Sequence, residues 1–119
     1  MKIQITLPDG EATGEIVDSA AGHELMALLP VTIEMYDLFE REKPGPLPRP
    51  LVTATDTMLT YSVGQIGYWA DSHDIIFFTA DDGKLEIPEP GIVHLGTVTS
   101  GLEIIADAGD AFTITIDKL

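Results

Sequence analysis

The sequence predicts a mainly β protein, a small closed or nearly closed β-barrel with two short helices. Several short segments alternate apolar and polar residues, glycine-containing turns separate them, and only two segments have helical spacing. Many short strands with two helices are typical of a barrel capped at its ends. With 119 residues and 45% hydrophobic content, the chain suits one domain, which we place over residues 1–119.

The chain opens with a predicted β-hairpin. Segment 2–7 places Ile3, Ile5 and Leu7 at alternate positions, as a strand with one buried face requires. Asp9-Gly10 is a strong turn signal, and segment 12–17 returns as the second strand.

A short helix and a third strand follow. Either Asp18 or Ser19 can cap the helix, whose leucines share one face until Pro30 ends it. Residues 31–38 then alternate, although imperfectly, and predict a strand.

The segment KPGPLPRPL carries prolines at 44, 46, 48 and 50. Each proline lacks an amide donor, so the segment cannot form a helix or a central strand. We expect a loop or a sheet edge here.

The second half of the chain predicts four more strands and one helix. Gly64, Ser72 and Asp82-Gly83 mark turns between the strands. The strands are expected at 65–70, 74–79, 91–98 and 112–117, and the helix at 100–108, ending at Gly109.

Charge limits the classes of partner. Twenty acidic residues against six basic ones give a formal charge of -14, which repels nucleic acids and anionic membrane surfaces. Half of the basic residues, Arg41, Lys43 and Arg49, fall in one short segment. We therefore expect no nucleic acid and no membrane as partner, and an anionic or polar ligand entering beside Arg49.

Other chemistry is limited by what the chain lacks. No cysteine is present, which excludes disulfides, thiolate catalysis and cysteine-bound zinc. There is no run of eighteen apolar residues and no charged-then-apolar leader, so we expect a cytoplasmic protein. His73 between Asp71 and Asp74 offers metal-binding atom types, but such a cluster in a tight turn is more typical of a solvated hairpin tip. We predict no metal and no cofactor.

Three stretches together resemble a known fold. HLGTVTSGLEIIADAG is similar to the last strand and helix of cyclophilins, with Gly96, Val98 and Gly101-Leu102 at the matching places. ATGEIVDSAAGHELMALL resembles their second strand and first helix, and IIFFT resembles their phenylalanine-pair strand. The chain thus resembles the small bacterial and archaeal cyclophilin-like family over nearly its whole length. The resemblance implies a cyclophilin-like β-barrel.

The resemblance implies less about activity. Cyclophilins act as prolyl isomerases through an arginine, a glutamine, phenylalanines, a tryptophan and a histidine on the outer face of the barrel. Phe78 matches the pocket phenylalanine, while Ile76 stands where the glutamine would be. Ile92 takes the histidine position and His94 lies two residues on, which is the same face of a strand. Arg49 matches the arginine by chain order only, and no tryptophan matches.

The stretch YWADSHDIIFFTADDG allows two interpretations, an ordinary hairpin with its aromatic residues in the core or one wall of a binding site. We favour a domain that binds a small molecule or short peptide segment in an outer-face pocket lined by Arg49, Tyr68, Phe78 and His94. The alternatives are a weak peptidyl-prolyl cis-trans isomerase and an interaction module without a ligand. The identity of the ligand and the oligomeric state stay open.

Overall fold

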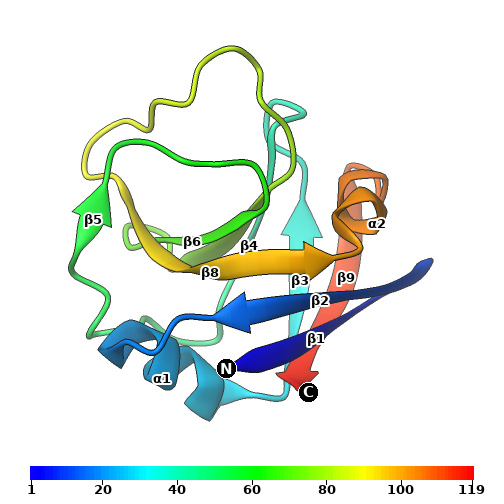
Figure 1. Ribbon diagram of the computed structural model, residues 1–119, viewed down its shortest axis with the longest axis horizontal. Helices are drawn as coiled ribbons and strands as arrows, with labels where there is room; N and C mark the ends of the chain where they lie inside the picture. The colour runs from blue at the N-terminus through cyan, green and yellow to red at the C-terminus, as the bar shows by residue number, and fades with distance from the viewer.

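The computed structural model describes all residues from 1 to 119 and confirms the mainly β, nearly closed barrel with two short helices (Figure 1). Eight strands follow one another around the barrel in the order β3-β9-β1-β2-β8-β6-β7-β4, and β5 pairs with β8 beside this path. The elements are β1 (Lys2–Leu7), β2 (Gly10–Ile16), α1 (Ala20–Leu28), β3 (Val31–Tyr36), β4 (Glu42–Pro46), β5 (Thr57–Met58), β6 (Gln65–Trp69), β7 (Asp74–Phe78), β8 (Ile92–Ser100), α2 (Leu102–Ala106) and β9 (Ala111–Lys118).

The opening hairpin is confirmed, with its turn one residue earlier than expected. Leu7 pairs with Gly10, so Pro8 and Asp9 form the two-residue turn and Gly10 already belongs to β2. The fixed φ of proline suits the first central position of a tight turn. The C-terminal strand β9 pairs with β1 on the other side, and the Leu119 amide donates to the Lys2 carbonyl, so the two ends of the chain lie close together (Figure 1).

Helix α1 begins after Ser19, whose Oγ accepts a hydrogen bond from the Gly22 amide at 3.0 Å. Ser19 rather than Asp18 is therefore the cap. The helix buries Leu25 completely against the barrel interior and ends before Pro30, as its sequence predicts. None of the helices in the structure has the length and apolarity needed to cross a membrane.

Helix α2 is shorter than expected because β8 extends to Ser100. The Ser100 and Thr13 hydroxyls bond to each other at 2.6 Å across the β2–β8 pair, which keeps Ser100 in the strand. Gly101 then turns the chain with φ of 81°, a conformation that favours glycine. A side chain at Gly101 would also collide with the Glu11 carbonyl oxygen, 2.7 Å from its Cβ position.

The proline-rich segment is an edge strand followed by a loop. β4 pairs only with β7, with Pro44 opposite Ile76 and Pro46 opposite Asp74. This part of the prediction is confirmed, because prolines are tolerated where one side of a strand has no ladder partner. The short strand β5 has no counterpart among the predicted elements.

The barrel closes between β3 and β4, along a line that we call the seam. These two strands are not neighbours in the hydrogen-bonded order, and one isolated bridge, Leu38 to Glu42, links the chain on either side of their connecting turn. Gly45 lets the strands approach, since a Cβ there would lie 2.7 Å from the Glu34 carbonyl oxygen. Packing rather than a continuous ladder therefore holds the seam.

Two hydrophobic clusters form on the two sides of the sheet. The inner cluster holds 24 buried residues inside the barrel. The outer cluster consists of Tyr61, Ile76, Phe78, Ile87 and Ile92, and the long connection between β7 and β8 covers it. Strand β7 is buried on both faces, with Ile75 and Phe77 inside and Ile76 and Phe78 outside. The outer cluster forms one border of the pocket described next.

Candidate functional site

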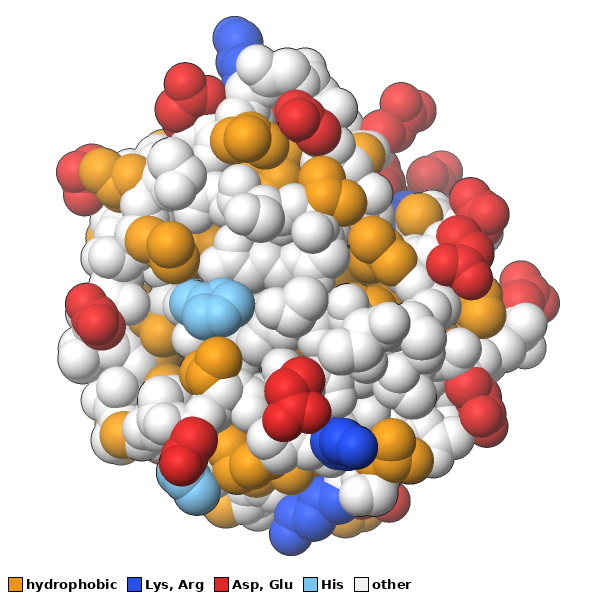
Figure 2. Space-filling model, in the orientation of Figure 1, with side chains coloured by type: hydrophobic (Ala, Val, Ile, Leu, Met, Phe, Trp, Pro, Cys, Tyr) orange, Lys and Arg blue, Asp and Glu red, His pale blue; other side chains and the backbone are white.

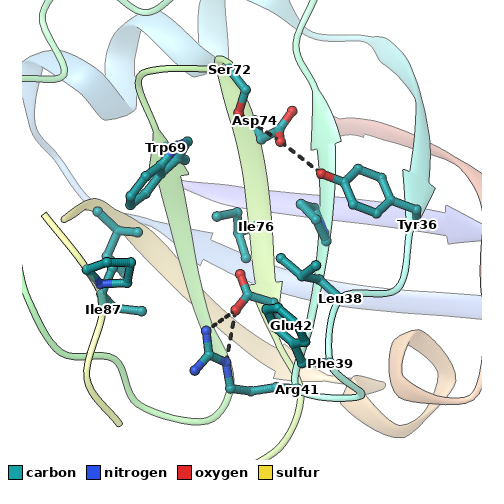
Figure 3. Close-up of a pocket in the computed structure, with 13 residues that line it drawn as sticks. Tyr36, Leu38, Phe39, Arg41, Glu42, Trp69, Ser72, Asp74, Ile76 and Ile87 are labelled. Carbon is teal, nitrogen blue, oxygen red and sulfur yellow. Dashed lines mark hydrogen bonds and ion pairs between the residues drawn. The ribbon is translucent and has the colours of Figure 1, made fainter. Parts of the chain in front are cut away.

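The most enclosed of the surface pockets, which we call the main pocket, lies on the outer face of β4 and β7 and has a volume of about 400 Å³ (Figure 3). Its floor consists of the neighbouring residues Pro44 and Ile76, which are paired across the two strands. Residues two positions apart on a strand share a face, so Glu42 and Asp74 lie at opposite ends of this floor. The pocket thus has an apolar middle and a carboxylate at each end.

The walls come from distant parts of the chain. On one side stand Trp69 of β6 and Ile87 of the β7–β8 connection. On the other side stand Tyr36 of β3 and Phe39 of the turn after it, so the pocket extends across the seam (Figure 3). Phe39 is 74% exposed and has φ of 59°. An exposed phenylalanine held in this unfavourable conformation provides an apolar rim.

One end of the pocket is an ion pair between consecutive residues. Arg41 Nε donates to Glu42 Oε1 at 2.9 Å, and its Nη2 donates to the same oxygen. The guanidinium also lies over the Tyr61 ring, 5.2 Å from its centre, and 3.9 Å from Asp82. Both partners of the ion pair are largely buried, with side chains 13% and 6% exposed.

Burial shifts the pKa values of Glu42 and Arg41 in opposite directions. Burial raises the pKa of Glu42, and the hydrogen bond and charge of Arg41 only partly oppose it. Burial lowers the pKa of Arg41, but the hydrogen bond and charge of Glu42 outweigh burial and raise it overall. Arg41 is therefore a fixed cation whose charge Glu42 and Asp82 already compensate.

The other end of the pocket is built around Asp74, which is 7% exposed. Its Oδ2 accepts hydrogen bonds from Ser72 Oγ at 3.0 Å and from the Tyr36 hydroxyl at 3.4 Å (Figure 3). Burial raises the pKa of Tyr36, and the neighbouring Asp74 charge adds to this effect. The second oxygen, Oδ1, has no partner in the chain, and no completely buried side-chain polar atom is unsatisfied. Oδ1 is thus an acceptor without a partner that is not completely buried.

The four residues expected to share a pocket are not brought together. Tyr68 is 1% exposed and belongs to the inner cluster, where its hydroxyl accepts a hydrogen bond from the Leu51 amide. Phe78 is on the outer side but completely buried, stacked on Tyr61 with ring centres 4.3 Å apart. Neither lines the main pocket. Ile76, by contrast, forms its floor.

His94 and Arg49 also lie outside the main pocket. His94 Nδ1 is 2.9 Å from Gln65 Nε2 on the adjacent strand. The Gln65 oxygen accepts from the Ser62 amide at 3.0 Å, so the Gln65 nitrogen must be the donor to His94. The histidine proton is then on Nε2. Arg49 is exposed and makes no ion pair.

The sequence pointed only in part to the residues that line the pocket. Trp69, Asp74 and Ile76 all lie in the stretch YWADSHDIIFFTADDG, which is a hairpin and also one wall of the pocket. No sequence pattern predicts Tyr36 as a pocket residue, because its position depends on closure of the barrel at the seam. No group of three or more acidic or histidine side chains is arranged to hold a metal ion.

The charge of the molecular surface follows the composition. In the view of Figure 2, acidic side chains spread over the molecule, basic ones are few, and hydrophobic side chains form small separate groups. Of the three basic residues expected to attract an anion, Arg41 pairs with Glu42 and Lys43 pairs with Asp37 at 2.8 Å. The expected positive field is therefore largely neutralised within the chain.

Comparison with known proteins gives the family. The model of the cyclophilin-like family matches residues 5–117. The solution structure of a hypothetical protein from Archaeoglobus fulgidus has the same fold, with a TM-score of 0.75 and 15% identity over 100% of this chain and 95% of that one. No curated protein sequence matches the chain. The match over almost the whole chain, together with the nearly closed barrel, shows that this protein belongs to the cyclophilin-like family.

Proposed function

We propose that this protein is a binding domain whose outer-face pocket takes a small molecule or a short peptide segment. The observation that carries the proposal is the pocket itself. Its volume of about 400 Å³ falls in the usual range for ligand sites, and its apolar floor ends at Asp74, whose Oδ1 has no partner in the chain. An apolar body and one or two polar contacts are what such a pocket recognises.

The residues proposed to contact the ligand are Tyr36, Trp69, Asp74 and Ile76. Trp69, Asp74 and Ile76 lie on the paired strands β6 and β7, and Tyr36 reaches Asp74 from β3 across the seam, so the fold itself forms the pocket. A preformed pocket avoids the cost of ordering side chains on binding. Phe78 packs beside Ile76 in the outer cluster and so helps to hold the floor residue in place.

The test is a ligand screen with a variant that fills the pocket. A ligand that binds only the folded state at one hundred times its Kd adds about 2.7 kcal/mol to the free energy of unfolding, which a thermal shift detects. Ile76→Phe should abolish the shift by occupying the floor. Val52→Phe, at a position 78% exposed and outside the pocket, is the matched control. Shifts that survive Ile76→Phe would remove this pocket from the function.

The alternative, a weak peptidyl-prolyl isomerase, is favoured by one feature, an apolar seat with the Arg41 guanidinium at its edge. An isomerase must stabilise the twisted amide with a donor. Here Glu42 engages Arg41, and Ile76 offers no hydrogen bond. We therefore expect little or no acceleration in a protease-coupled assay with proline peptides. Activity near that of ordinary cyclophilins, lost in an Arg41→Met variant shown to be folded, would instead establish the enzyme.

A further inference from the structure

We infer that the pocket selects ligands whose polar end is a cationic amine, held at Asp74. This inference rests on the proposed function and adds to it the charge of the ligand and the end of the pocket where that charge lies.

The pocket offers more free acceptors than free donors. Asp74 Oδ1 and Glu42 Oε2 have no hydrogen-bond partner in the chain, and neither is completely buried, because no completely buried side-chain polar atom is unsatisfied. Arg41 is the only basic residue that lines the pocket, and two carboxylates already surround it. An anionic ligand would have to displace Glu42 from Arg41, whereas a cation finds open acceptors.

The hydrogen bonds that hold Asp74 also favour a cationic ligand. Two hydroxyl donors, from Ser72 and Tyr36, fix Oδ2 and so fix the orientation of Oδ1. Asp74 is 7% exposed, and its Oδ1 has no partner in the chain. A cationic donor should bind this oxygen more strongly than a neutral donor, because charge-assisted hydrogen bonds are about twice as strong as neutral ones. The overall charge of -14 adds to the attraction of a cation toward the pocket.

The aromatic side chains around Asp74 favour a cationic ligand as well. Trp69 pairs with Asp74 across β6 and β7, and Tyr36 reaches the same carboxylate from β3, so Asp74 stands between two aromatic side chains (Figure 3). Aromatic faces attract ammonium and guanidinium groups. The apolar body then lies on Ile76, along a floor of roughly 13 Å from the position of Asp74 to that of Glu42, at the usual rise per strand residue.

The probes are three compounds with one body and different ends: 3-phenylpropylamine, 3-phenylpropanol and 3-phenylpropanoate. The indole N–H signal and fluorescence of Trp69 report binding at the pocket without ambiguity, because the chain has one tryptophan. We expect the amine to bind at least tenfold more tightly than the alcohol, and the propanoate to bind more weakly than both.

Two variants test whether Asp74 causes the preference for the amine. Asp74→Asn should abolish the preference for the amine over the alcohol, because an uncharged amide gives an ammonium group no charge-assisted hydrogen bond. Asp9→Asn, in the turn between β1 and β2, changes the net charge equally and should preserve the preference. Because the comparison of amine with alcohol is made on the unaltered protein, the inference stays testable even where Asp74→Asn fails to fold.

Each outcome has one meaning. Equal binding of amine and alcohol, or tighter binding of the propanoate, overturns the inference and leaves the binding function standing. A preference that survives in folded Asp74→Asn also overturns it. Failure of all three compounds to shift the Trp69 signals up to their solubility limits contradicts the binding function in this pocket, and the inference with it.

Discussion

Removal of the Arg41 side chain should destabilise the fold in a way that depends on pH. Glu42 is 6% exposed at its side chain, and Arg41 supplies its hydrogen bonds within the chain. Arg41→Met keeps much of the packing against Tyr61 but leaves a buried carboxylate without its partner. Breaking a buried pair from one side costs about 3–5 kcal/mol. A small domain has a total stability of about 5–15 kcal/mol, so this loss is a large fraction of the total.

The sign of the pH dependence follows from Glu42. Its folded pKa is raised above 4.5 by burial, so its protonated form favours the folded state. The stability from this group is fully present below pH 4.5 and is lost as the pH rises through the folded pKa. In Arg41→Met the opposing effect of the arginine is absent, so the loss should be larger and extend to higher pH than in the unaltered protein.

Urea unfolding followed by Trp69 fluorescence at pH 4.5 and pH 7.5 measures both effects. The double variant Arg41→Met/Glu42→Gln should recover much of the stability at pH 7.5, because it no longer buries a charge without a partner. A single variant as stable as the unaltered protein at pH 7.5, or a loss of equal size at the two pH values, would refute this reasoning.

Three further predictions follow. Lys43→Met should cost about 1.5–3 kcal/mol in urea unfolding at neutral pH, because Lys43 Nζ bonds to both Asp37 and a backbone oxygen; Lys43 lowers the pKa of Asp37, so this cost should shrink as the pH falls below 3.8. Gly45→Ala should cost about 1–3 kcal/mol in the same measurement, since its Cβ would collide with a backbone oxygen of β3; a neutral result would contradict the close approach at the seam. Neutral His94 should show the Nε2–H tautomer in ¹⁵N NMR spectra, and Gln65→Leu should release that preference; an Nδ1–H form would contradict the assigned hydrogen bond.

Most of the barrel was predictable because most of its strands bury one face. Segments β1, β3 and β9 alternate buried and exposed residues, so their periodicity indicates both the strand and its inner face. Strand β7 gives no such signal, since all five of its residues are buried. From sequence, Phe78 and Tyr68 therefore looked like members of one surface, whereas the pairing register puts Tyr68 beside the inward Ile75.

The pocket was harder to predict for a different reason. Arg41 and Glu42 are adjacent in sequence, and adjacent strand residues normally point to opposite faces. Their ion pair depends on the turn between β3 and β4, where Leu38 and Glu42 exchange backbone hydrogen bonds. The wall formed by Ile87 depends on a long connection folding back over β7, which no local pattern predicts.

The seam between β3 and β4 couples the pocket to the mechanical integrity of the barrel. Tyr36 stands on one side of it and Asp74 on the other, joined by a single hydroxyl contact. If the two strands part, that contact breaks and the pocket loses one wall, so an occupied pocket and an open seam exclude each other. A bound ligand should then slow amide hydrogen exchange in β3 and β4 more than elsewhere, because these two strands can separate only when the pocket is empty.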